Sequence, residues 1–96
     1  MELGEDIYRC VSRERQASIR ALFASMEYMT DEIDGVLCSL DNISHRENLD
    51  SESVKDVRDH LKAAREGLVK IAKSKYENSR ACRDVLCDEP YYLKEA

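Results

Sequence analysis

Four cysteines and two histidines are the residues of this 96-residue chain best suited to metal binding, thiol chemistry or acid–base catalysis. Their spacing does not fit these roles, because no Cys-x2-Cys pair occurs and neither His45 nor His60 lies near a second pair of ligands. The sequence also has no glycine-rich phosphate loop and no Gly-x-Ser-x-Gly motif. We therefore expect no enzyme, no metal site and no cofactor.

The elements that would position any site are indicated by apolar residues that recur at alternating steps of three and four. One run covers the first half of the chain: Ile19, Leu22, Met26, Met29, Ile33, Val36, Leu40 and Ile43. A second run has the same steps: Val54, Val57, Leu61, Ala64, Leu68 and Ile71. This spacing is typical of helices that pack in the manner of coiled coils.

The sequence thus predicts a single all-α domain made of two long helices, at about residues 5–44 and 51–87. The loop 45–50 joins them, and Asp50 or Ser51 is the expected N-cap of the second helix. A helix break near Thr30 is the alternative, but the apolar pattern runs through that point without interruption. Pro90 disfavours helical geometry at the residue before it, so residues 88–96 are expected to be an irregular tail.

Charge predicts how the two helices lie. Residues 1–43 contain nine acidic residues and four arginines, whereas residues 53–86 contain nine basic and five acidic residues. A short loop makes the helices antiparallel neighbours, and the acidic stretch then lies beside the basic one. In this hairpin Cys10 and Cys87 would be opposite each other at the open end. A disulfide there is one candidate, and reduced thiols are the alternative.

The apolar surface is wider than two helices can cover. Phe23 and Leu37 lie beside the first seam, and small residues such as Ser25 and Gly67 flank both seams and permit close helix approach. A stripe wider than a coiled-coil seam needs more than one partner helix. We therefore expect either a homodimeric four-helix bundle or binding of the hairpin to another protein.

The expected function is that of a non-enzymatic protein–protein interaction module, a small regulator, inhibitor or adaptor that acts through a helix face. One alternative is an RNA-binding dimer that uses the basic stripe Lys55, Arg58, Lys62 and Arg65. The net charge of −5 weighs against it, because nucleic-acid binding depends on neutralising phosphates.

Another alternative is an acidic inhibitor that mimics nucleic acid in a basic groove. Its candidate contact residues, together with the aromatic tail, are Glu27, Asp31, Asp34, Tyr91 and Tyr92. No apolar run approaches the roughly 18 residues of a membrane span. The acidic first residues do not resemble a secretory signal, so a cytoplasmic protein is expected.

Overall fold

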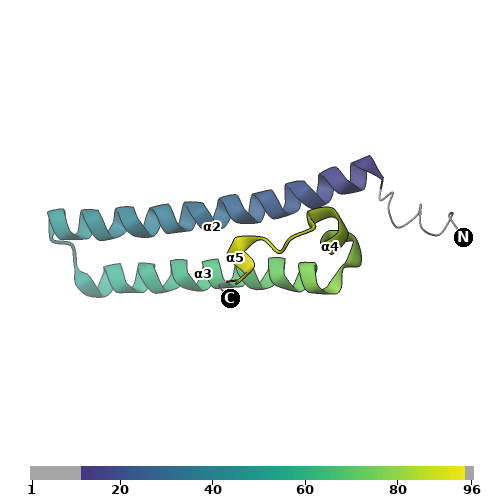
Figure 1. Ribbon diagram of the computed structural model, residues 1–96. Coiled ribbons are helices and arrows are strands. Elements are labelled where there is room, and N and C mark those ends of the chain that lie inside the picture. The colour runs from purple at the N-terminus through teal and green to yellow at the C-terminus, as the bar shows by residue number, and fades with distance from the viewer. Residues whose placement is uncertain (1–11, 95–96) are drawn as a thin grey trace, which may run out of the picture.

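The computed structural model describes residues 12–94, and these residues form helices and no strand. The helices are α2 (Arg13–Glu47), α3 (Ser51–Asn78), α4 (Arg80–Leu86) and α5 (Tyr91–Lys94). Figure 1 shows α2 and α3 side by side in opposite directions, with α4 turning back beyond the end of α3 and α5 lying against the pair. The all-α prediction is confirmed.

Helix α2 begins at Ser12, whose Oγ accepts a hydrogen bond from the N–H of Arg15 at 3.2 Å. It continues through Thr30 without a break, so the prediction of a single first helix is correct there. It ends at Asn48, which adopts a left-handed conformation (φ 51°) that Asn tolerates better than most residues. The part of the predicted helix before residue 12 lies outside the described residues.

Asp50 begins α3, as one of the two expected caps. Its carboxylate accepts hydrogen bonds from the N–H of Ser53 at 3.1 Å and from the Ser53 hydroxyl at 2.7 Å. These bonds favour the ionised form and lower the pKa of Asp50. The cap satisfies one of the free N–H groups of the first turn and fixes where α3 starts after the connection.

The second helix ends earlier than the sequence suggested, at Asn78 rather than near residue 87. Ser79 is extended (φ −127°, ψ 109°) and its Oγ caps α4 by accepting from the N–H of Cys82 at 3.2 Å. The Asn78 amide bonds back to the carbonyl of Ser74 at 2.9 Å. Arg83 donates to the carbonyls of Tyr76 and Glu77, which α3 leaves unpaired at its end. Local polar side chains therefore stabilise the break.

The predicted irregular tail is instead ordered and forms the helical turn α5. Tyr92 and Leu93 are fully buried, at 1% and 0% exposure. They join a core at the far end of the α2–α3 pair, away from the connecting turn. The buried members of that core are Ile19, Phe23, Met26, Val69, Ala72, Cys82, Tyr92 and Leu93. The chain thus closes its open end with its own C-terminal segment.

A candidate protein-interaction face

The α2–α3 contact buries only half of the predicted seam. In α2 the predicted residues Ile19 and Met26 are buried and Ile33 and Leu40 are half-buried, as expected. The other half of the predicted α2 seam is not buried. The residue directly after each of its members turns inward instead, and these inward residues are Phe23, Thr30, Leu37 and Ser44. Helix α3 behaves alike, because Val54, Leu61 and Leu68 point inward together with Arg58, Arg65 and Ala72.

The remaining predicted seam residues lie on the surface, which corrects the sequence interpretation. They are exposed by between 38% and 61%, and they are Leu22, Met29, Val36 and Ile43 of α2 with Val57 and Ile71 of α3. Ala64 of α3 is exposed as well. In both helices each of these residues directly precedes an inward-facing one. Equivalent positions of two antiparallel helices lie on the same side of the pair. The seven residues therefore form one surface, which we call the apolar face.

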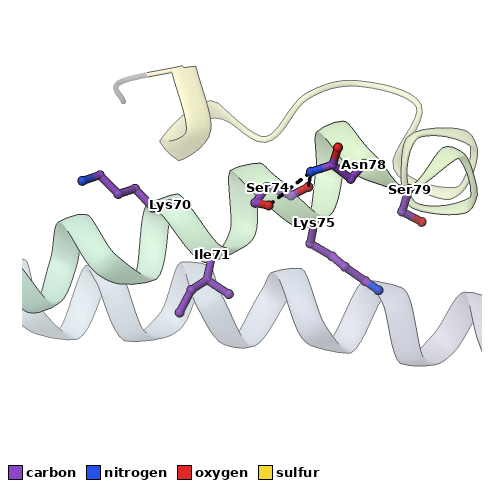
Figure 2. A pocket seen from close by; sticks show the side chains of 6 residues that line it. All are labelled: Lys70, Ile71, Ser74, Lys75, Asn78 and Ser79. Carbon is purple, nitrogen blue, oxygen red and sulfur yellow. Dashed lines mark hydrogen bonds between the residues drawn. The ribbon is translucent and has the colours of Figure 1, made fainter.

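A shallow hollow of about 520 Å³ lies at the α4 end of this face. Figure 2 shows its lining on α3, where the Asn78 amide bonds to Ser74 and the side chains of Ile71 and Lys75 extend toward α2. The lining residues are Lys70, Ile71, Ser74, Lys75, Asn78 and Ser79. The hollow offers hydrocarbon and short polar groups, with two lysines at its edge.

The opposite side of the pair is charged. Arg65 donates to Asp34 at 2.8 Å, and Arg58 pairs with Asp41. From Asp34 to Asp41 the chain advances by seven residues, and from Arg65 to Arg58 it goes back by seven. This is the relation expected between antiparallel helices. Acidic residues of α2 stand two positions before residues of the apolar face, as Asp34 does before Val36. Two positions correspond to about 200° of helical turn, which places them on opposite sides.

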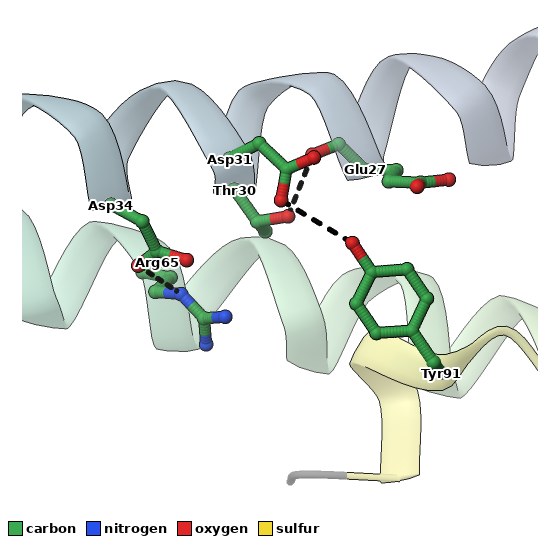
Figure 3. Close-up of polar contacts among 6 residues, drawn as sticks. All are labelled: Glu27, Thr30, Asp31, Asp34, Arg65 and Tyr91. Atoms are coloured by element: carbon green, nitrogen blue, oxygen red, sulfur yellow. Dashed lines mark hydrogen bonds and ion pairs between the residues drawn. The ribbon is translucent and has the colours of Figure 1, made fainter.

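The tail lies over one part of this charged side, where Figure 3 shows Tyr91 reaching Asp31 beside Glu27, with the Asp34–Arg65 pair farther along the helices. We call this side the tail-bearing face. The Tyr91 hydroxyl donates to Asp31 at 3.4 Å. Desolvation and the nearby carboxylates of Asp31 and Glu27 raise the pKa of Tyr91. Two of the candidate acidic residues, Glu27 and Asp31, therefore lie beside the candidate Tyr91 on this face.

Tyr92 is the buried anchor of the tail, which corrects its assignment as a partner-binding residue. Its hydroxyl donates to the main-chain carbonyl of Phe23 at 2.9 Å, and its ring stacks edge-on against Tyr91. Phe23 in turn packs edge-on against Tyr76, with ring centroids 6.4 Å apart. The tail is thereby fastened to α2 by a polar bond inside an aromatic cluster.

The tail contact is expected to weaken in alkaline solution. Burial, followed by the charge of Glu27, raises the pKa of Tyr92 from its usual 10.0 to about 12. A raised tyrosine pKa means that folding favours the neutral form, so this stabilisation is complete below pH 10.0 and is lost as the pH rises through about 12. Chemical denaturation at intervals across this pH window should show the loss as a falling free energy of unfolding. Tyr92→Phe should lack it, and an identical fall in that variant would contradict the assignment.

The basic stripe is divided by the fold. Arg58 and Arg65 are partly buried and paired with acidic residues of α2, whereas Lys55 and Lys62 are exposed. Cys38 and Cys87 are exposed free thiols, and Cys82 is a buried one. The proposed Cys10–Cys87 disulfide lies outside the described residues because Cys10 does. Between residues 12 and 94 no three His, Cys, Asp or Glu side chains gather as metal ligands would.

Comparisons with known proteins do not add to this description. No family model matches the chain, and no curated protein or solved structure is significantly similar to it. Within the described part of the chain, no helix combines the length and apolar character that crossing a bilayer requires.

Proposed function

We propose that this protein is a non-catalytic interaction module, a small regulator or adaptor that binds a protein partner through the apolar face. The observation that supports it is the concentration of exposed hydrophobic residues. Nine large hydrophobic side chains are exposed among the described residues, and six of them belong to the apolar face. Hydrocarbon exposed in one contiguous patch costs roughly 25 cal/mol per Å², which a partner would recover by covering it. Such patches mark interaction sites.

No segment of residues 12–94 covers this face. The tail instead lies on the tail-bearing face, where Tyr91 contacts Asp31 and Tyr92 reaches Phe23. Binding through the apolar face therefore needs no rearrangement of the tail. The four-helix bundle expected from the sequence is one form that this binding takes.

The two alternative functions have less support. RNA binding would use the basic stripe, of which Lys55 and Lys62 are exposed but Arg58 and Arg65 are already balanced by Asp41 and Asp34. Mimicry of nucleic acid would use Asp34 and Asp31, of which the first pairs with Arg65 and the second accepts a bond from Tyr91. Each alternative would therefore break contacts within the chain or use only part of its candidate residues.

A capture experiment with matched variants tests the proposal. Met29→Glu places a charge on the apolar face, and Leu49→Glu places the same charge on an equally exposed side chain in the turn, at 42% against 38% exposure. Burying an unpaired carboxylate is costly, so Met29→Glu should capture at least about tenfold less partner from native extract than the wild type. Leu49→Glu should capture as the wild type does. Equal capture by both variants, with unchanged helix content, would contradict the proposal.

A further inference from the structure

We infer that the apolar face is covered by a second copy of this chain, with α2 of each subunit packed on α3 of the other. The inference rests on the proposed function and names its partner. In the resulting four-helix bundle both α2–α3 connections lie at the same end. Each helix would then contact the other helix of its own subunit with one side and the partner subunit with the side that carries the apolar face.

The size of the face suits such a dimer. From Leu22 to Ile43 the apolar face extends about 32 Å at the rise of an α-helix, and two helices of about 10 Å diameter are together about 20 Å wide. The face is thus on the order of 600 Å², which lies at the lower end of the area that each partner contributes to a stable protein complex.

The composition of the face allows two copies to approach closely. Next to the apolar residues, on the side away from the α2–α3 contact, both helices carry mainly small residues. These are Ser18, Ser25, Ser39, Ser53, Gly67 and Ser74. Small side chains let helix backbones come near each other, and serine hydroxyls can bond to a neighbouring helix. Both helices therefore present a row of apolar residues beside a row of small residues. The face can meet a copy of itself so that its apolar rows contact the apolar rows of the copy.

Charges at the edge of the face select the relative orientation. The register of the Asp34–Arg65 and Asp41–Arg58 pairs places Gly67 level with Glu32. Lys70 stands three residues beyond Gly67 along α3, which is about 4.5 Å of helix rise. A two-fold axis parallel to the helices keeps every residue at its level. It therefore brings Glu32 within reach of Lys70 of the partner subunit.

A second pair follows the same rule. Ser53 is level with Arg46, and Asp56 stands three residues beyond Ser53 in the same direction along α3. Arg46 would thus reach Asp56 of the partner subunit with the same offset. All four charged residues are exposed in the single chain. Two symmetry-related copies of each pair would form, all with opposite charges.

The other face-to-face arrangement places the connections at opposite ends and stacks α2 on α2. Full overlap of the apolar rows centres that dimer near residue 32 of α2. Glu32 would then lie against the partner's Glu32 at the two-fold axis. Like charges placed together suppress an arrangement more than single exposed pairs favour one. The same-end arrangement is therefore the one that the charges select.

The first experiment is light scattering coupled to size-exclusion chromatography in reductant, which keeps Cys38 and Cys87 from cross-linking. The wild type and Leu49→Glu should have twice the 11.1 kDa mass of one chain. Ile71 is 61% exposed, so Ile71→Glu leaves the fold of the subunit intact. It should raise the dissociation constant of the dimer at least about 100-fold, because its carboxylate would be buried without a partner. A dimer of unchanged affinity in Ile71→Glu would overturn the inference.

The second experiment tests the orientation by exchanging charges. Glu32→Lys and Lys70→Glu should each weaken the dimer about three- to tenfold, because each places like charges together. The double variant should regain at least half of the binding free energy that the two single variants together lose. Additive weakening in the double variant would overturn the α2-on-α3 arrangement.

The two proposals fail in different ways. A wild type that stays monomeric, yet loses a captured protein when Met29→Glu is introduced, would overturn the second copy as occupant and keep the proposed function. A monomeric wild type whose captured proteins are the same in Met29→Glu would overturn both. A dimer sensitive to Ile71→Glu but not to Leu49→Glu supports both.

Discussion

Phe23→Ala is expected to destabilise the subunit by about 3–5 kcal/mol, whereas Leu22→Ala is expected to cost less than about 1 kcal/mol. Phe23 is 3% exposed, contacts the ring of Tyr76 and lies under the tail. Truncating it removes buried hydrocarbon and leaves a cavity at the junction of α2, α3 and α5. Leu22 is 39% exposed in the single chain, so its truncation removes little buried surface.

Chemical denaturation followed by circular dichroism measures both changes. Both substitutions are made in the Ile71→Glu background, so that contacts between two copies do not enter the free energy of unfolding. Adjacent residues of one helix then serve as each other's control. A larger loss for Leu22→Ala than for Phe23→Ala would mean that α2 faces α3 with the row predicted from the sequence.

Leu93→Ala is expected to cost about 2–4 kcal/mol and to release the tail. Leu93 has no exposed surface and belongs to the core that closes the open end of the pair, although it sits in a helix of only four residues. So short a helix does not persist without its buried contacts. Losing one of them should therefore unfold α5 locally before the long helices unfold.

Hydrogen exchange of the residue 91–94 amides, together with denaturation, measures the two effects. Exchange should become faster in Leu93→Ala and stay unchanged in Lys94→Ala, whose side chain is exposed. The free energy of unfolding should fall only in the first variant. Unchanged exchange in Leu93→Ala would show that the Tyr92 hydrogen bond alone holds the tail.

The sequence predicted the all-α class, an uninterrupted α2 and the cap of α3, because these depend on local patterns. It did not predict which row of residues faces the other helix. The row containing Leu22, Met29 and Val36 is entirely apolar, whereas the row actually buried contains Thr30. That hydroxyl donates to the carbonyl of Glu27 at 2.8 Å, which removes the cost of burying it. The pattern of apolar residues in the sequence gives no indication of such a hydrogen bond.

Helix α3 illustrates the same limit. Its inward row contains Arg58 and Arg65, whose aliphatic stems can pack while their guanidinium groups reach Asp41 and Asp34. The charge pattern predicted that the basic stretch lies beside the acidic one, and Arg58 and Arg65 form ion pairs with Asp41 and Asp34. It did not foresee that the pairs would draw the arginines inward and turn Val57 and Ile71 to the surface.

The end of α3 and the tail depended on contacts far apart in sequence. Asn78 and Ser79 were the visible signal for the break, because both side chains compete for backbone hydrogen bonds. The burial of Tyr92 against Phe23 has no such local signal. Sequence alone also does not tell that Tyr91 lies beside Glu27 and Asp31.

The bond from Tyr92 to Phe23 also bears on the order in which the protein is made. The α2–α3 pair can assemble from its connecting turn outward as α3 leaves the ribosome, since the contacts nearest that turn are close in sequence. Residues 88–94 are synthesised after all of α3, and among them Tyr92 and Leu93 complete the far end of the core. Until residues 88–94 are in place, Ile19, Phe23 and Met26 lack part of their cover, so hydrophobic surface is exposed at that end of the core.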